Sequence, residues 1–195
     1  MDAQDARALL EWYHMAGIDE AGRGCLAGPV VAAAVILPHD ADLPGVDDSK
    51  KLSAKQRNAA LPHIQAQAVA VGVGLCSPEE IDRLNILWAA MEAMRRAAAD
   101  LTPNPDYLLI DGNRCFPDSP WPFATLVKGD QRSLSIAAAS IVAKVTRDRI
   151  MRDLAEVWPM YGWAQNAGYP TKAHYEALAA HGPSPVHRQS FRLSR

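Results

Sequence analysis

The sequence predicts an α/β fold in which a mixed five-stranded sheet is flanked by helices and followed by a helical C-terminal extension. Short apolar runs rich in Val and Ile, typical of buried strands, alternate with amphipathic helical patterns along the chain. The 195 residues are 49% hydrophobic, which excludes a disordered chain and is enough for one ordinary core. No repeat or linker divides them, so we expect one domain over residues 1–195, with residues 159–195 as the extension.

Five segments have the pattern of strands. The first three are expected at residues 14–19, 29–37 and 69–75, and the second is apolar enough to be buried on both faces. These three strands can form an antiparallel meander. The fourth and fifth strands are expected at residues 107–110 and 123–127.

Two helices are expected between the second and fourth strands. Ser53 is a suitable N-cap for a helix over residues 54–67. Ser77 and Pro78 suit the N-cap and first position of the next helix. Apolar residues then recur every three or four positions as far as Ala98, which predicts one amphipathic helix facing a core.

Two more helices are expected in the C-terminal part. The first covers residues 134–157, and the second follows Thr171 and ends at the stop signal His181-Gly182-Pro183. A stripe of small and polar residues runs along the longer helix, where Ser and Lys can bind phosphate: Ser133, Ala137, Ser140, Lys144 and Asp148. The alternative for Lys144 is an ion pair with Asp148, one helical turn away.

Composition excludes several classes of protein. The longest apolar run, residues 30–37, is too short to span a bilayer, and residues 1–11 are too polar for a signal peptide. We therefore expect a cytoplasmic protein with no membrane partner. The three cysteines, Cys25, Cys76 and Cys115, are far apart and odd in number, so neither a disulfide framework nor a zinc site is predicted.

The charges are unevenly distributed although the formal net charge is only −2. Residues 1–127 carry an acidic excess and residues 128–195 a basic excess. A basic C-terminal part can follow a phosphate backbone, while the acidic excess elsewhere can include metal ligands.

Carboxylates follow three of the predicted strands. Asp19 and Glu20 come where the first apolar run ends, before a glycine-rich turn, and Asp111 and Asp130 follow the fourth and fifth strands. Oxygen ligands without His or Cys select hard cations such as Mg²⁺ or Mn²⁺. Paired ions of this kind suit phosphodiester hydrolysis. The sequence therefore predicts a metal-dependent hydrolase of nucleic acid.

Each carboxylate also has a simpler interpretation. An Asp at a strand end often starts a loop or caps a helix, although all three places together, each beside a glycine, are harder to explain in this way. The glycines at 22, 24 and 28 do not form a dinucleotide-binding loop, because their spacing differs and a strand follows them.

Six motifs follow one another along the chain. They are GIDEAGRG at 17–24, DSKKLS at 48–53, IDGNR at 110–114, KGD at 128–130, IAAASIVAKVTRD at 136–148 and GYPT at 168–171. Together, and in this order, they resemble one family, the bacterial ribonucleases HII of the type 2 ribonuclease H family. The resemblance covers residues 16–191.

The resemblance implies an RNase H-like fold and two-metal hydrolysis of RNA in RNA–DNA hybrids, or at single ribonucleotides in duplex DNA, by a monomer that uses Mn²⁺ or Mg²⁺. It implies that the catalytic and metal-binding residues are Asp19, Glu20, Asp111 and Asp130. It implies that substrate is bound by Gly22, Arg23, Gly24 and Tyr169, and by Ser49, Lys50, Ser140 and Lys144. The alternative for Tyr169 is a half-buried ring that packs the last helix.

The chain departs from the family pattern at two positions. Ala167 stands where a Lys is expected, which puts one phosphate contact in doubt, and Cys25 stands where Pro is usual. Ribonuclease HIII is the nearest alternative, but that family has Thr where this chain has Arg23. Another RNase H-like nuclease would lack the Gly-Arg-Gly turn paired with Tyr169.

Overall fold

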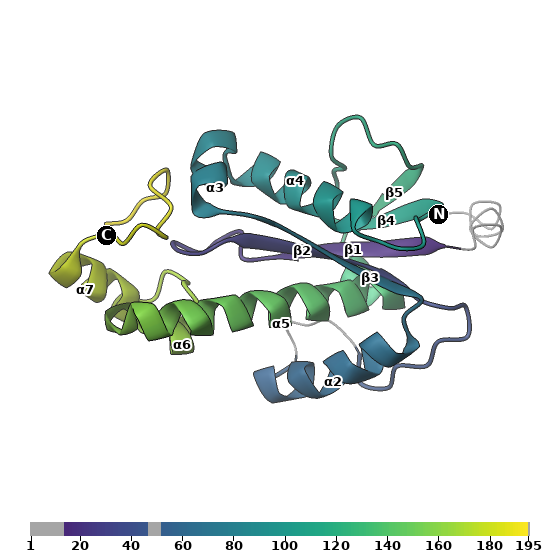
Figure 1. Ribbon diagram of the computed structural model, residues 1–195, viewed down its shortest axis with the longest axis horizontal. Helices are drawn as coiled ribbons and strands as arrows, with labels where there is room; N and C mark the ends of the chain where they lie inside the picture. The colour runs from purple at the N-terminus through teal and green to yellow at the C-terminus, as the bar shows by residue number, and fades with distance from the viewer. Residues whose placement is uncertain (1–13, 47–51, 195) are drawn as a thin grey trace.

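Figure 1 shows the computed structural model of the chain, in which residues 14–46 and 52–194 are described. The order of elements in this part is β1 (Met15–Ala21), β2 (Val30–Ile36), α2 (Ala54–Gln67), β3 (Ala70–Cys76), α3 (Pro78–Leu84), α4 (Ile86–Ala99), β4 (Tyr107–Asp111), β5 (Phe123–Leu126), the 3₁₀ helix η1 (Gly129–Gln131), α5 (Leu134–Val157), the 3₁₀ helix η2 (Pro159–Tyr161), α6 (Trp163–Asn166) and α7 (Lys172–His181).

The strands form one mixed sheet in the order β3-β2-β1-β4-β5. β1, β2 and β3 pair antiparallel, which confirms the predicted meander. β4 and β5 lie parallel to β1 and to each other, so the carboxyl ends of β1, β4 and β5 point the same way. The mixed five-stranded sheet flanked by helices is the fold that the sequence predicts.

Helices cover both faces of the sheet, with α3 and α4 on one side and α5 and α2 on the other (Figure 1). The alternation of β2 divides its side chains between the two layers, because successive residues of a strand point to opposite faces. Ala32 and Ala34 pack in the cluster of α4, and Ala33 and Val35 pack in the cluster of α5 and α2. Close packing of β1 on α5 requires a glycine: a Cβ on Gly17 would lie 2.2 Å from the carbonyl carbon of Ser135.

The single helix predicted from Ser77 to Ala98 is wrong. The structure has two helices there, α3 and α4, which meet at Asn85. Asn85 adopts a left-handed φ of 64°, and its side-chain oxygen accepts the N–H groups of Leu87 and Trp88 as the N-cap of α4. Apolar spacing continues across the break, so periodicity alone does not reveal it.

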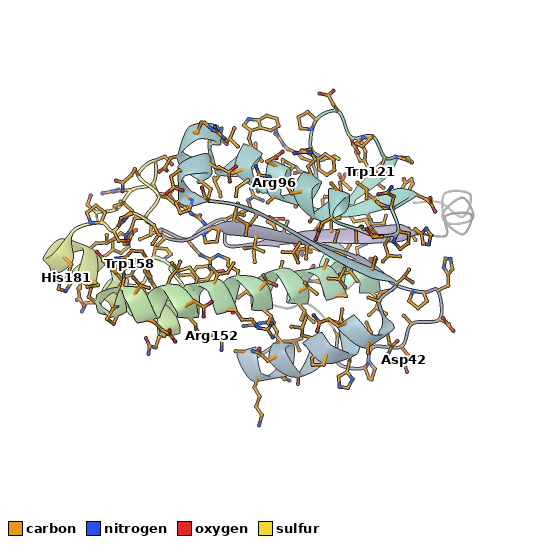
Figure 2. The ribbon with its side chains drawn as sticks, in the orientation of Figure 1. Asp42, Arg96, Trp121, Arg152, Trp158 and His181 are labelled. Atoms are coloured by element: carbon orange, nitrogen blue, oxygen red, sulfur yellow. The ribbon has the colours of Figure 1, made fainter. Side chains whose placement is uncertain are left out.

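The C-terminal extension, residues 159–194, has its own small core at the far end of α5. It contains Trp163 and Leu178, packed on Leu26 and Met151 from the rest of the chain. In Figure 2, Trp158 and His181 are labelled at this end of the molecule, where the extension lies. No helix in the described ranges is sufficiently long and apolar to traverse a bilayer.

Candidate active site

A cleft of about 470 Å³ lies beside the glycine-rich connection between β1 and β2. It collects residues from β1, β4, α2, α5 and the turn before α7. We call it the acidic cleft, and its lining is Asp19, Glu20, Ala21, Gly22, Arg23, Gly24, Arg57, Asp111, Ser140, Lys144 and Tyr169.

Sheet register brings the carboxylates of β1 and β4 together. The pairing of the two strands ends at Ile18 and Ile110, and Asp19 and Asp111 are the next residues on each. We predicted that the first strand ends at Asp19, but β1 pairs with β2 as far as Ala21. Beyond Ile18 it therefore runs with β2 alone, which opens one edge of the strand to the cleft.

Asp19 is the most buried of these carboxylates, with 3% of its surface exposed. Burial raises its pKa well above the ordinary value, and the neighbouring charges of Glu20 and Asp111 raise it further. A hydrogen bond from the Ser140 side chain and one from the Glu20 N–H (2.7 Å) act in the opposite direction. The net effect is that the two hydrogen bonds do not fully stabilise the negative charge of Asp19.

Glu20 has one cationic neighbour. Burial raises the pKa of Glu20, whereas the Arg23 guanidinium, whose Nη1 lies 3.1 Å from Oε1, lowers it; the Asp111 charge raises it again. Arg23 is half exposed, so this ion pair is a weak constraint that a substrate can replace.

The third and fourth predicted carboxylates differ in position. Asp111 ends β4, and its Oδ1 accepts the N–H of Gly129 at 2.7 Å. Asp130 follows Gly129 in η1 rather than ending β5, and it is buried, with 5% exposure. It is not among the residues that line the acidic cleft, so three of the four predicted carboxylates share the cleft.

The chemistry of this donor set fits a hard divalent cation. Carboxylates that are desolvated and repel one another are stabilised most by a cation that lies between them. Within residues 14–46 and 52–194, however, no three carboxylate, imidazole or thiolate side chains converge on one point closely enough to form a ready-made metal cage.

The two flanking glycines of the Gly-Arg-Gly turn differ in what a side chain at each position would meet. Gly22 has a φ of 96°, and a Cβ there would lie 2.0 Å from Nε of Arg147. Gly24 has no such constraint, because a Cβ built on it meets nothing within 4 Å. The protein itself needs a glycine at 22, whereas at 24 the missing side chain leaves space in the cleft.

The opposite wall of the cleft comes from α5 and the turn before α7. Lys144 on α5 forms the ion pair with Asp148 that the helical spacing predicts, at 2.7 Å, and it still lines the cleft. Its Nζ also lies 5.2 Å from the ring centre of Tyr169, which is 39% exposed. The structure therefore brings Ser140, Lys144 and Tyr169 to the carboxylates, whereas Ser49 and Lys50 lie outside the described residues.

Of the two positions that depart from the family pattern, one is buried and the other is partly exposed. Cys25 is fully buried beside Tyr169, and burial raises the pKa of its thiol. Ala167 adopts a left-handed φ of 47°, and its carbonyl accepts a hydrogen bond from Arg147 Nη1 at 2.8 Å.

Sequence reasoning missed three arginines around the cleft. Arg57 of α2 lines it, and its guanidinium lies 3.7 Å from Asp148. Arg147 and Arg188 are fully buried and donate to backbone carbonyls of the glycine-rich connection. Arg147 falls within the long α5 motif, but no local pattern distinguishes Arg188 from a surface arginine.

A buried network beneath Tyr169 was missed as well. The Ser184 N–H donates to Nδ1 of His187, and the Trp163 indole donates to Nε2 of His174. Because these two ring nitrogens accept, His187 carries its proton on Nε2, which faces His174 at 3.1 Å. His174 then carries its own on Nδ1 and donates to the Tyr169 carbonyl at 2.9 Å.

Comparison with known proteins identifies the family. The family model for ribonuclease HII matches residues 16–194. The ribonuclease HII of Salinibacter ruber is 59% identical, and the alignment covers 100% of both chains. The crystal structure of ribonuclease H2 from Pyrococcus horikoshii superposes with a TM-score of 0.76 at 26% identity, over 93% of this chain and 95% of that one.

The alternative family shares only the fold. The Mn²⁺ complex of Bst-RNase HIII has a TM-score of 0.73 at 20% identity and covers 93% of this chain but 68% of its own. The family model and the close relatives instead carry the HII name. The chain therefore belongs to the ribonuclease HII family and is a ribonuclease H, an endonuclease that hydrolyses phosphodiester bonds.

Proposed function

We propose that this enzyme hydrolyses the RNA strand of RNA–DNA hybrids and also cuts at single ribonucleotides embedded in duplex DNA, on the 5′ side of the ribonucleotide. The observation that carries the proposal is the composition of the acidic cleft. Carboxylates Asp19, Glu20 and Asp111 face the same space as the side-chain-free turn at Gly24 and the ring of Tyr169. The residues proposed for hydrolysis thus lie beside those proposed to recognise the sugar.

Each wall has a separate role in this proposal. Asp19, Glu20 and Asp111 hold divalent cations, Mg²⁺ or Mn²⁺, and Asp130 completes the set from η1. Two such cations when bound supply an activated water and stabilise the leaving oxygen. Ser140 keeps Asp19 oriented through its hydrogen bond.

The other wall binds and orients the nucleic acid. Backbone N–H groups of the turn at Gly22–Gly24 contact the 2′-hydroxyl, the group that separates RNA from DNA. Tyr169 places its ring against the sugar beside the scissile phosphate. Lys144 offers a cation to a backbone phosphate, with Ser49 and Lys50 as further expected phosphate contacts.

A labelled DNA duplex with one ribonucleotide tests the proposal. With Mg²⁺ or Mn²⁺ the cut should lie 5′ to the ribonucleotide and leave 3′-hydroxyl and 5′-phosphate ends, and EDTA should abolish it. A 2′,3′-cyclic phosphate would mean that the 2′-hydroxyl is the nucleophile, and full activity in EDTA would contradict the metal-dependent scheme. The all-DNA duplex is the matched control and should remain intact.

A further inference from the structure

Arg188, in the C-terminal extension, is a fully buried cation with only backbone carbonyls as hydrogen-bond acceptors. Its guanidinium donates to the carbonyl of Gly22 at 2.7 Å and to those of Arg23 and Gly28 at 3.0 Å. Burying a charge without an ion-pair partner costs several kcal/mol before hydrogen bonds offset it. The three carbonyls therefore hold the Arg188 guanidinium against the Gly-Arg-Gly turn.

The segment around Arg188 is itself held on both sides. Residue 187 forms an isolated antiparallel bridge with Ala27, and the Arg188 N–H donates to the Leu26 carbonyl at 2.9 Å. On the other side, the Asp82 carboxylate of α3 accepts the N–H groups of Gln189 and Ser190, each at 2.9 Å. The extension thus holds the Arg188 guanidinium in a fixed position beside the turn.

Peptide geometry determines what this cation does to the turn. In a planar trans peptide, the C=O and N–H groups point in opposite directions. Because the carbonyls of Gly22 and Arg23 face Arg188, the N–H groups of Arg23 and Gly24 face away from it. Neither N–H forms a hydrogen bond with any residue of the described ranges.

Two adjacent N–H groups of this kind form a small site for an oxygen atom. Arg23 and Gly24 both line the acidic cleft, and the space around Gly24 is open. A cation that binds the carbonyl of a peptide polarises its N–H and strengthens it as a donor. Burial lowers the pKa of Arg188 to about 10, so the guanidinium remains charged at neutral pH.

Arg147 provides an internal comparison. It is equally buried and also donates to three backbone carbonyls at 2.8–3.0 Å, those of Pro29, Ala167 and Ala27. The N–H groups that follow two of these carbonyls, on Gly28 and Gly168, bind the Val186 carbonyl and the Asn166 side chain. Arg147 therefore braces peptides whose donors are used within the protein.

We propose that Arg188 is a positioning residue that holds the Arg23 and Gly24 N–H groups toward the 2′-oxygen of a ribonucleotide, so that the C-terminal extension sets the preference for RNA over DNA. This inference rests on the proposed function, because it assigns a residue outside the cleft to the recognition step of the same reaction.

The test measures a preference rather than an activity. In an Asp111→Asn background, which removes cleavage, the dissociation constants of a duplex with one ribonucleotide and of the all-DNA duplex are compared on the same sample. Partial unfolding changes both constants by the same factor, so their ratio is insensitive to stability. Arg188→Lys keeps the charge but cannot span three carbonyls, and the preference should fall by about tenfold. Arg147→Lys should lower the melting temperature comparably and keep the ratio.

Three outcomes are informative. Loss of preference in Arg188→Lys but not in Arg147→Lys supports the inference. An unchanged ratio in Arg188→Lys overturns it, and so does equal binding of the two duplexes by the Asp111→Asn parent when the protein with native Asp111 cuts at the ribonucleotide. If the protein with native Asp111 fails to cut at the ribonucleotide, the proposed function fails instead.

Discussion

At the scale of single residues, the carboxylates of the acidic cleft act against the stability of the metal-free protein. Asp19 is buried and Glu20 is largely so, and the charge of Asp111 adds to the repulsion. A site organised for folding alone would pair these charges with cations. The arrangement is explained if the site is organised for a ligand that brings positive charge with it.

The first prediction concerns Asp111. Asp111→Asn removes one charge from the cleft, while the amide oxygen can still accept the Gly129 N–H. Cleavage of a hybrid should fall by orders of magnitude, and the melting temperature without metal should stay equal or rise, because a repulsion is removed. Near-normal cleavage rates would refute the assignment.

A second prediction separates the two glycines of the turn. Gly24→Ala should change the free energy of unfolding by less than about 0.5 kcal/mol, since its Cβ meets nothing. Cleavage should nevertheless fall, because the methyl group occupies space that the sugar needs. Gly22→Ala is the contrasting variant: its positive φ and the contact with Arg147 should lower stability by more than about 1 kcal/mol. Urea denaturation and initial rates give both quantities, and a fully active Gly24→Ala would show that the sugar lies elsewhere.

The third prediction concerns Tyr169, whose ring is 39% exposed at the cleft. Tyr169→Ala should reduce kcat/KM at single embedded ribonucleotides far more than on long hybrids, because long hybrids offer several registers and more 2′-hydroxyl contacts. Tyr169→Phe should fall between, since it keeps the stacked ring, worth about 1–3 kcal/mol, and loses the hydroxyl. Equal losses on both substrates would make Tyr169 a structural or general catalytic residue and would remove its role in reading the ribonucleotide.

At the scale of elements, the break between α3 and α4 gives a prediction about stability. Asn85 combines a left-handed backbone with a side chain that caps α4. Asn85→Ala loses the cap and strains the backbone, and should cost about 1–2 kcal/mol. Asn85→Gly suits the positive φ and should cost less. Denaturation midpoints of the two variants measure this order, and the reverse order would mean that the positive φ at position 85 does not strain an alanine.

The elements also show how far sequence patterns reach. Strands, caps and the antiparallel meander were predictable because alternation, propensity and Ser or Thr caps are local properties. The pairing of β1 beyond Asp19 was not, because the register that places Ala21 opposite Val31 depends on both strands together. Asn85 was missed because one residue with positive φ does not disturb the apolar period on either side of it.

Some residues of the site could likewise be predicted from the sequence, and others could not. Asp19, Glu20 and Asp111 could be identified from the sequence, because each lies at or beside the end of an apolar segment that has the pattern of a strand. Arg188 could not, because its acceptors are carbonyls 160 to 166 positions away and carry no side-chain signature. Long-range contacts to the backbone leave no pattern in the sequence that they stabilise.

At the scale of the whole molecule, the buried histidine network makes stability depend on pH. Burial lowers the pKa of His187 from 6.5 to about 4, and the neighbouring His174 contributes. Above pH 6.5 both folded and unfolded states are neutral at His187, so its contribution to stability is complete. As the pH falls from 6.5 to 4, only the unfolded state gains the proton, and stability should drop by about 2–3 kcal/mol.

Urea midpoints between pH 4 and pH 8 test this. His187→Gln cannot titrate, so its profile should be flatter than that of the native sequence across this window, although its stability at pH 7 should be lower. The difference between the two profiles isolates the contribution of His187 from those of groups that the two proteins share. Parallel profiles would show that His187 is not protonated on unfolding.

The connection between β1 and β2 has a consequence for where a strand is cut. Asp19 and Gly22 belong to one continuous stretch of backbone, with β1 ending at Ala21 between them. A strand advances about 3.3 Å per residue, so this spacing is a molecular ruler whose length covalent bonds determine. In the proposed mode of binding, a substitution elsewhere should weaken the hold on a duplex and leave the position of the incision unchanged, whereas an inserted or deleted residue between Glu20 and Gly22 should shift it.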